Sequence, residues 1–285
     1  MDSRPLRLAR RLRDKILGKS SLAMPEGVQV IDFDGVRVPL DFSQHTHRTV
    51  FRRGFFEQEL TRALAQAVRP GDVFLDIGTN FGWHTLQLAV KYPELDHFYA
   101  IEPSSRSFQL FQQGVEANGL QEKIQARQIA LGRETGEAAL KHFTGLGLVN
   151  SSIYPLADLS FEQETVLVEA LDKLIPDFQG TPAIIKCDVE GSELDVLHGA
   201  EALLSGKFGV PPMWFLEANY ETSGMAGYFP WQLIEKAQEH APYEGYMLRG
   251  GGIVKMPHAK ALRHGDTLVL AIAESHAERL TGSPV

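Results

Sequence analysis

The spacing of apolar and polar residues divides most of the chain into alternating strands and helices. Short apolar runs are typical of buried strands, and apolar residues that recur every three or four positions are typical of amphipathic helices. Strands are expected at residues 73–77, 97–101, 124–131, 183–187 and 213–216. Helices are expected at residues 57–68, 83–90 and 230–240, after Ser104, and around Leu194, Leu197 and Leu204. This alternation predicts an α/β fold with a mostly parallel sheet and helices on both faces.

Both ends of the chain carry strand patterns of another kind. Asp34-Gly35, a strong hairpin signal, stands between apolar runs at residues 28–33 and 36–40. Near the C-terminus, residues 243–248 and 267–273 are expected to close the sheet as antiparallel strands. The loop Gly250-Gly251-Gly252 is expected to join these two closing strands.

One interior segment interrupts the alternation. Residues 132–180 contain several glycines among short strand-like pieces, so we expect an irregular insertion in the same domain. The predicted organisation has three parts: an extension with a basic helix and the hairpin at residues 1–53, a main domain at 54–273, and a tail at 274–285.

The N-terminal stretch differs in charge from the rest of the chain. Leu8, Leu12 and Ile16 recur every four residues among arginines and lysines, which predicts a short basic amphipathic helix. Residues 1–24 carry a net charge of +5, and because the whole chain carries −8, the remaining residues sum to −13. Residues 1–20 could therefore lie on an anionic membrane surface. Because the apolar stripe is short and lacks Trp or Phe, we favour packing on the acidic body or on a second copy of the chain.

The composition excludes several classes of protein. The chain has 285 residues and one cysteine, Cys187, so an internal disulfide and a four-cysteine zinc site are both excluded. No apolar run reaches the roughly 18 residues of a transmembrane helix, and the N-terminus lacks the apolar core of a secretory signal. We therefore expect a cytoplasmic protein. The acidic body argues against nucleic acid as a partner.

A glycine-containing turn after the first strand of the main domain predicts a nucleoside site. Asp76 lies at the end of that strand, Gly78 and Gly82 permit a tight turn, and Glu102 ends the next strand, where a carboxylate can bind both ribose hydroxyls. The dinucleotide fingerprint requires a further glycine, but Asn80 occupies that place. Asp76 would repel a pyrophosphate and attract the amino group of a sulfonium cofactor. The pattern therefore favours S-adenosylmethionine over NAD.

The fourth strand ends in charged residues that predict a catalytic edge. Lys186, Asp188 and Glu190 are too costly to bury unpaired, so they should face the cleft or one another. Asp188 is the first candidate for the base that activates an acceptor hydroxyl, and Lys186 and Glu190 are candidates for orienting or acid–base partners. Glu217 and Asn219 end the fifth strand and, with Asp188, could instead hold Mg²⁺.

Taken together, the motifs resemble the FkbM family of S-adenosylmethionine-dependent methyltransferases over roughly residues 54–220. The resemblance rests on Gly71-Asp72-Val73-Phe74-Leu75-Asp76-Ile77-Gly78-Thr79-Asn80-Phe81-Gly82, on Ile101-Glu102-Pro103, and on Ile185-Lys186-Cys187-Asp188-Val189-Glu190-Gly191-Ser192-Glu193. It implies a class I, Rossmann-like methyltransferase domain that methylates a hydroxyl of a sugar, glycan or natural-product-like molecule. The cofactor-binding residues it implies are Glu57, Asp76, Gly78, Thr79, Asn80, Gly82, Glu102, Pro103, Ala130 and Asp188.

Other functions stay open at this point. A dinucleotide-binding oxidoreductase is disfavoured by the glycine spacing, and a non-catalytic module of the same fold is disfavoured by the intact charged set. A nucleic-acid amino-methyltransferase would carry Asn/Asp-Pro-Pro-Tyr/Phe after the fourth strand, and this chain does not. Two further sets hold weaker candidates: His45, His47, His84 and His264 as bases, and Phe81, Trp83 and Tyr220 as stacking residues. Acceptor specificity is expected in residues 132–180 and 221–265.

Overall fold

The computed structural model describes residues 24–143, 151–154, 161–263 and 265–281. The basic helix expected within residues 1–20 and the candidate base His264 lie outside the described residues. Within the described part, no helix is both long and apolar enough to span a membrane.

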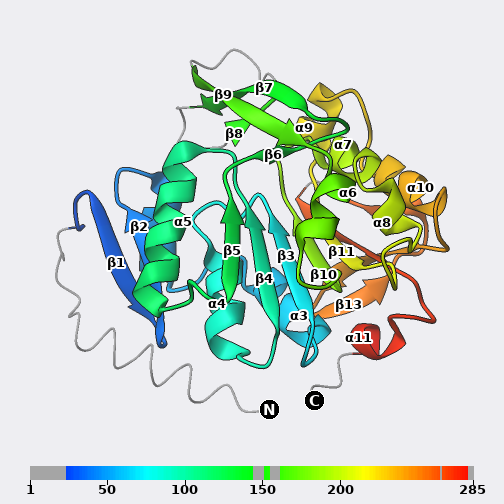
Figure 1. Ribbon diagram of the computed structural model, residues 1–285, viewed down its shortest axis with the longest axis horizontal. Coiled ribbons are helices and arrows are strands. Elements are labelled where there is room, and N and C mark those ends of the chain that lie inside the picture. Colours follow the sequence, from blue (N-terminus) through cyan, green and yellow to red (C-terminus); the bar gives the residue numbers. More distant parts are fainter. Residues whose placement is uncertain (1–23, 144–150, 155–160, 264, 282–285) are drawn as a thin grey trace.

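The core of the fold is an eight-stranded sheet in the order β13-β12-β14-β11-β10-β3-β4-β5 (Figure 1). Its strands are β3 (Val73–Ile77), β4 (His97–Ile101), β5 (Ile124–Arg127), β10 (Ile184–Cys187), β11 (Met213–Ala218), β12 (Glu244–Arg249), β13 (Gly252–Lys255) and β14 (Asp266–Ala271). The five strands from β11 to β5 are parallel, and β14, β12 and β13 are antiparallel. This confirms the predicted α/β fold of the class I methyltransferase type, with a mostly parallel sheet and antiparallel closing strands.

Helices cover both faces of this sheet because side chains alternate along each strand. In β3, Phe74 joins one apolar cluster, whereas Leu75 and Ile77 join the other. One face is covered by α3 (Gln58–Ala67), α4 (Trp83–Lys91) and α5 (Ser105–Asn118). The other is covered by α6 (Leu171–Leu174), the 3₁₀ turn η1 (Ile175–Asp177), α7 (Glu193–His198), α8 (Glu201–Leu204) and α10 (Gln232–Gln238).

Four expectations about these elements need correction. The strand expected at 124–131 divides, and its end becomes β6 (Ala130–Leu131) in a second sheet. The helix expected around Leu194 and Leu204 is two short helices, α7 and α8. The glycine loop does not join the two closing strands: Gly250 and Gly251 turn β12 into β13, which the alternation did not reveal. A helix α9 (Tyr220–Met225) also precedes α10 and was not expected.

Residues 132–180 are more regular than expected. They contribute β7 (Gly136–Phe143), β8 (Ser151–Ser152) and β9 (Phe161–Glu169), which form a second sheet with β6 in the order β6-β9-β7-β8. Eight residue pairs align β7 with β9 in antiparallel register. This small sheet lies beyond the carboxyl ends of the parallel strands, where it can cover a ligand (Figure 1).

The N-terminal hairpin and the C-terminal helix are docked onto the main sheet's helices and turns. The hairpin consists of β1 (Val28–Phe33) and β2 (Val36–Asp41), as predicted, and Arg37 binds the end of α5 through Asn118 and the Ala117 carbonyl. Helix α2 (His45–Arg53), which was not expected, follows it. Near the C-terminus, the 3₁₀ turn η2 (Ala259–Ala261) precedes β14, and α11 (Ala277–Thr281) follows it. Arg279 of α11 makes two hydrogen bonds with Asp72, so part of the predicted tail belongs to the fold.

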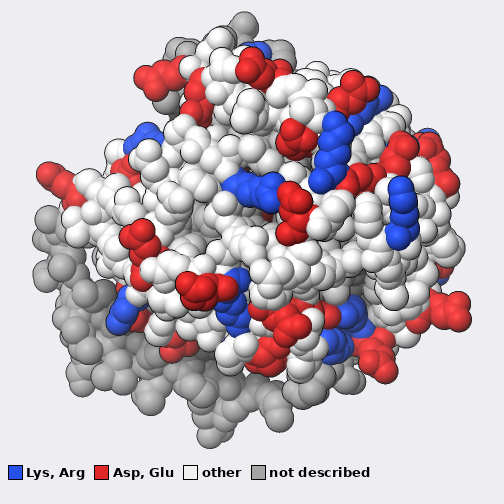
Figure 2. All heavy atoms as spheres, in the orientation of Figure 1, with Lys and Arg blue, Asp and Glu red and all other residues white. Residues whose placement is uncertain are grey.

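Surface charge on the described residues is mixed. On the face shown in Figure 2, acidic and basic side chains lie among one another, and basic residues do not form a continuous band there.

Candidate active site

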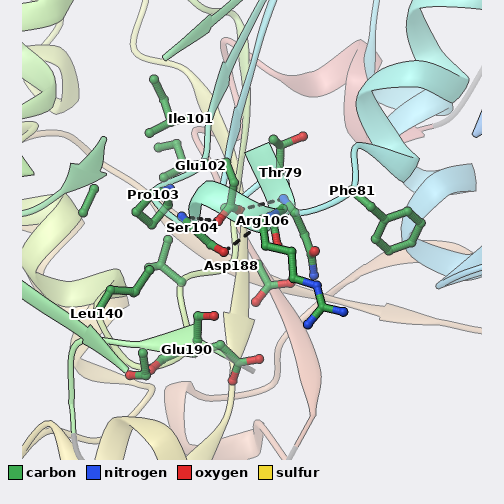
Figure 3. A pocket seen from close by; sticks show the side chains of 18 of the residues that line it. Thr79, Phe81, Ile101, Glu102, Pro103, Ser104, Arg106, Leu140, Asp188 and Glu190 are labelled. Carbon is green, nitrogen blue, oxygen red and sulfur yellow. Dashed lines mark hydrogen bonds between the residues drawn. The ribbon is translucent and has the colours of Figure 1, made fainter. Parts of the chain in front are cut away.

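A cavity of about 560 Å³ opens at the carboxyl ends of β3, β4 and β10. The strand order reverses between β3 and β10, and ligands of open α/β sheets bind at such a reversal. The small sheet also lines the cavity, through Leu140 of β7 (Figure 3) and through His142 of β7 and Glu164 of β9. The nucleoside motif and the catalytic edge predicted from the sequence thus share one cavity.

The glycine turn brings β3 against β10. Gly78 has φ of +72°, and a Cβ atom there would lie 1.9 Å from the backbone oxygen of Asp188. Asn80 is also left-handed, with φ of +53°. Gly82 has a different role from the one expected, because a Cβ there would lie 2.2 Å from the ring of Phe111, and Gly82 does not line the cavity. We therefore remove Gly82 from the cofactor-binding set: it lets α4 begin against α5.

Glu102 lies where the sequence predicted a ribose-binding carboxylate. It is buried at the end of β4 and lines the cavity together with Pro103. One of its oxygens accepts a hydrogen bond from the backbone N–H of Asn80, and the other accepts one from Ser104, both at 2.8 Å (Figure 3). Burial raises the pKa of Glu102 to about 7, although these two hydrogen bonds act in the opposite direction. Each oxygen keeps a lone pair that a ligand hydroxyl can reach.

Contrary to the prediction, Asp76 does not face the cavity. Its side chain is fully buried, and one of its oxygens accepts hydrogen bonds from the hydroxyls of Thr79 and Thr85 at 2.9 and 2.7 Å. Its other oxygen lies 3.3 Å from the ammonium nitrogen of Lys186. Asp76 is therefore a structural partner of Lys186, and its side chain does not line the cavity where it was expected to bind a cofactor amino group. Thr79, which lines the cavity, donates a hydrogen bond to Asp76 through its side-chain hydroxyl.

Lys186 connects the turn to the catalytic edge. Its ammonium group donates to the backbone oxygen of Gly78 at 2.7 Å and lies 3.7 Å from Asp188. Burial alone would lower the pKa of Lys186, but Asp76, Asp188 and Glu57 more than offset it, so the pKa is raised well above its ordinary value. Lys186 consequently remains protonated, which fits the expected orienting role and not that of a proton acceptor.

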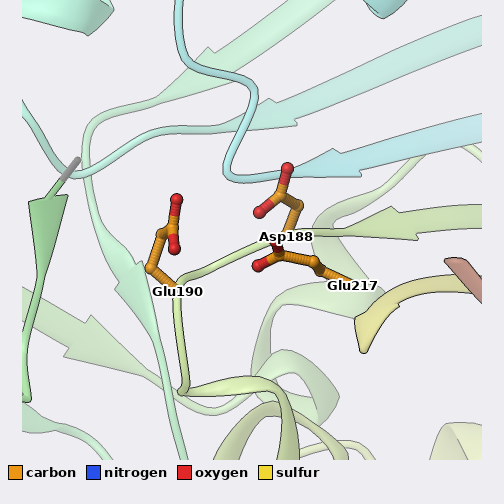
Figure 4. Close-up of side chains that lie close together, drawn as sticks. All are labelled: Asp188, Glu190 and Glu217. Carbon is orange, nitrogen blue, oxygen red and sulfur yellow. The ribbon is translucent and has the colours of Figure 1, made fainter. Parts of the chain in front are cut away.

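Three carboxylates converge at the catalytic edge. Asp188 and Glu190 follow β10, and Glu217 lies in β11; each offers an oxygen within 4.8 Å of those of the other two (Figure 4). One oxygen of Glu190 and one of Glu217 are buried without a hydrogen-bond partner among the described residues. Burial and like charge raise the pKa of all three carboxyls, that of Glu190 to about 8.

Asn219 does not belong to this carboxylate cluster. Its side-chain oxygen accepts hydrogen bonds from the backbone N–H groups of Glu221 and Thr222, and so caps the start of α9. The metal-ligand set predicted from the sequence is therefore wrong at this position, and Glu190 takes the place of Asn219. Sequence spacing could not show this, because both residues follow a strand end.

The comparison with protein families decides the chain's identity. A family model described as the methyltransferase FkbM domain matches residues 76–240, which is more than half of the chain. The chain belongs to the FkbM methyltransferase family. The matched region contains Glu102, Asp188 and Glu217, whereas the segment that carries Glu57 precedes it.

Three proteins illustrate what this FkbM chain is similar to. A curated protein named Methyltransferase 1, from Beauveria bassiana (strain ARSEF 2860), is 33% identical over 154 residues, and the chain spans 60% of its length and 46% of its own. The methyltransferase FkbM from Methylobacillus flagellatus KT is 18% identical with a TM-score of 0.46, covering 71% of this chain and 44% of that one. TYW2 of M. jannaschii, solved with AdoMet, is 12% identical with a TM-score of 0.43, covering 88% and 87%.

The histidines and aromatic residues of this FkbM chain take mainly structural places. His47 is buried, its ring accepts the backbone N–H of Asp41, and burial lowers its pKa to about 4. Phe81 and Trp83 are buried core residues whose edges line the cavity. Tyr220 does not line it.

The histidine that does contact a site residue is His84. One of its ring nitrogens lies 2.9 Å from a carboxylate oxygen of Glu57, which lines the cavity as expected. Sequence reasoning did not reveal this pair, because its two members are 27 residues apart.

Proposed function

We propose that this protein is an S-adenosylmethionine-dependent O-methyltransferase that acts on a hydroxyl of a sugar, glycan or natural-product-like molecule. The observation that carries the proposal is that Glu102 and the cluster of Asp188, Glu190 and Glu217 line the same cavity. A ribose-binding carboxylate and a group that can accept a hydroxyl proton therefore lie within reach of one ligand. Membership of the FkbM family supports methyl transfer as the reaction.

The cavity has the features that this cofactor needs. Its volume of about 560 Å³ is within the usual range for small-molecule sites. Gly78 leaves open backbone where a side chain would collide with Asp188, and Glu102 offers two acceptors for ribose hydroxyls. Ala130 and Pro103 add apolar wall beside Glu102. A bound S-adenosylmethionine supplies an electrophilic methyl group on a sulfonium.

The chain's own residues supply positioning and proton transfer. A hydroxyl that approaches the cluster can donate its proton to Asp188, whose side chain is 29% exposed and has a raised pKa. Lys186, held by Gly78 and Asp76, fixes the orientation of Asp188. The small sheet, opposite the strand ends, limits the access of water to the cavity. These residues hold the reacting groups in line, which is the main requirement of a methyl transfer.

A metal-assisted version of the same reaction is a second candidate. Asp188, Glu190 and Glu217 provide only oxygen donors, and two buried oxygens without partners would gain a ligand from a divalent cation. Mg²⁺ prefers such donors together with waters. The cation would lower the pKa of an acceptor hydroxyl bound to it. The positive charge of Lys186, 3.7 Å from Asp188, counts against this version.

Two measurements test the proposal. Calorimetry should detect binding of S-adenosylmethionine and no comparable binding of NAD; the reverse result would indicate an oxidoreductase. Methyl-labelled cofactor should then be incubated with separate pools of nucleotide sugars, glycans, lipids, small metabolites and RNA. Label should enter a hydroxyl-bearing, non-nucleic-acid fraction. Loss of labelling in EDTA that Mg²⁺ restores would favour the metal-assisted version, and unchanged labelling would favour a side-chain base.

A further inference from the structure

The proposed cofactor carries an α-ammonium group, and this group needs a partner in the cavity. Asp76, the residue expected to bind it, is fully buried and already holds two threonine hydroxyls and Lys186. The backbone oxygen of Gly78, a neutral acceptor near the strand end, already accepts from Lys186. Another acceptor must therefore serve the ammonium group.

Glu57 has an unusual backbone conformation for its position. It occupies the N-cap of α3, where an acidic side chain normally accepts a hydrogen bond from the first turn of the helix. No such bond is present, and Glu57 has φ of +39°, which a residue with a side chain rarely adopts. Its side chain lines the cavity and is 40% exposed. Backbone strain of this kind is a feature of ligand-binding positions.

Two neighbours hold the Glu57 carboxylate in place. His84 lies 2.9 Å from one of its oxygens, and the other ring nitrogen of His84 lies 3.2 Å from the hydroxyl of Thr61. Because Glu57 has a lowered pKa, its carboxylate is ionised and only accepts, so the His84 nitrogen beside it donates. His84 is buried at 4% exposure and contacts one carboxylate oxygen of Glu57, whose side chain is partly exposed in the cavity, so we infer that the second oxygen is available to a ligand.

The other carboxylates near the turn are less suitable partners for an ammonium group. Glu102 has backbone N–H donors on both oxygens, and the proposed function assigns its remaining lone pairs to the ribose hydroxyls. Asp188 already lies beside Lys186. Glu190 and Glu217 repel one another and have raised pKa values, whereas burial of Glu57 is outweighed by the hydrogen bond and charge of His84, so that its pKa is lowered.

We propose that Glu57, held by His84, is the binding site for the α-ammonium group of the cofactor's amino-acid moiety, and that His84 is its positioning residue. The inference rests on the proposed function. It places one determinant of cofactor recognition on the segment before α3, outside the region that the family model matches.

The test compares two neutral thioethers that differ in the amino-acid moiety. S-adenosylhomocysteine carries it, and 5′-methylthioadenosine does not, so neither ligand introduces the sulfonium charge. In calorimetry, Glu57→Gln should weaken S-adenosylhomocysteine about 10-fold or more, the scale of a lost charged hydrogen bond, and should leave 5′-methylthioadenosine within about 2-fold. His84→Gln should produce the same selective loss at smaller size. The matched control Glu59→Gln, at an exposed residue in the first turn of α3 that does not line this cavity, should change neither affinity.

Every outcome of this experiment bears on the proposal. A selective loss in both Glu57→Gln and His84→Gln supports it, and rescue by Glu57→Asp of part of the lost affinity supports the requirement for charge. Equal losses for both ligands, or no loss for either, overturn the assignment of Glu57 to the ammonium group without overturning the proposed function. If the parent protein binds neither thioether, the proposed function fails together with this inference.

Discussion

The carboxylates at the two ends of the main cavity differ in their hydrogen-bond partners. At the nucleoside end, Glu102 is buried, but backbone N–H groups bind both of its oxygens. At the catalytic end, Asp188, Glu190 and Glu217 face one another, and buried oxygens of the last two have no partner among the described residues. One end is satisfied before any ligand arrives, whereas the other keeps like charges close together.

This difference indicates how the two ends contribute to function. A carboxylate with satisfied hydrogen bonds is rigid, so it can select a ligand by shape and direction. A group of carboxyls that face one another with unpartnered oxygens can bind a proton or a cation, so it can accept a proton during a reaction. Gly78 joins the two ends, because its turn contacts the backbone of Asp188 and its oxygen binds Lys186.

The largest effect is expected from removing the proton acceptor. Asp188→Asn should lower methyl transfer about 10²- to 10⁴-fold and change cofactor affinity much less, because the amide keeps the shape but cannot take the proton. Labelled methyl transfer and calorimetry measure the two effects separately. Asp177→Asn, at an exposed carboxylate outside the cavity, is the control. Turnover at the parental rate in Asp188→Asn would remove this residue from the mechanism.

A substitution of Gly78, which joins the two ends of the cavity, should destabilise the fold. In Gly78→Ala, the added Cβ would collide with the backbone of Asp188 in a left-handed conformation, which we expect to cost about 3–5 kcal/mol of unfolding free energy. Gly119→Ala is the matched control: Gly119 has φ of +68° but open space around its Cβ position, so about 1 kcal/mol is expected. Urea denaturation compares them, and similar losses would show that the contact with Asp188 is unimportant.

A substitution of Glu102, at the nucleoside end, should weaken the binding of every ligand that contains the ribose. Glu102→Gln replaces one acceptor with a donor that faces a backbone N–H, so cofactor binding should weaken by about 1–3 kcal/mol. S-adenosylhomocysteine and 5′-methylthioadenosine should lose affinity equally, since both contain the ribose. Unchanged affinity for both in calorimetry would reject the ribose role of Glu102.

The smallest effect is expected from Glu190 at the catalytic end, where a substitution should raise the stability of the fold instead of lowering it. The pKa of Glu190 is raised from 4.5 to about 8, so the folded state holds this proton more tightly than the unfolded state does. The wild type therefore loses stability as pH rises from about 4.5 to about 8, and Glu190→Gln should gain stability relative to the wild type over this range. Urea denaturation in EDTA at pH 5 and pH 8 tests this; a variant that gains no stability relative to the wild type between these two pH values would contradict it.

The sequence by itself determined the central strands of the main sheet, because each is a short apolar run with a clear end. Residues 73–77 and 97–101 were predicted as the structure has them, since burial on both faces leaves an uninterrupted apolar pattern. The small sheet escaped prediction because only a few of its residues are fully buried, so periodicity there is weak. The hairpin was predicted correctly because its turn is encoded by two adjacent residues.

At the site, the sequence determined which residue types stand at strand ends, and the tertiary structure decided what each one contacts. Glu102 and Asp188 lie at strand ends as expected, because the end of a strand fixes where the backbone of the next residue lies. Asp76 and Asn219 also follow strands, yet Asp76 is paired with Lys186 and Asn219 caps a helix. The pairing of Glu57 with His84 joins two helices through space. Hydrogen-bond partners depend on distances between elements, and these distances arise only when the core packs.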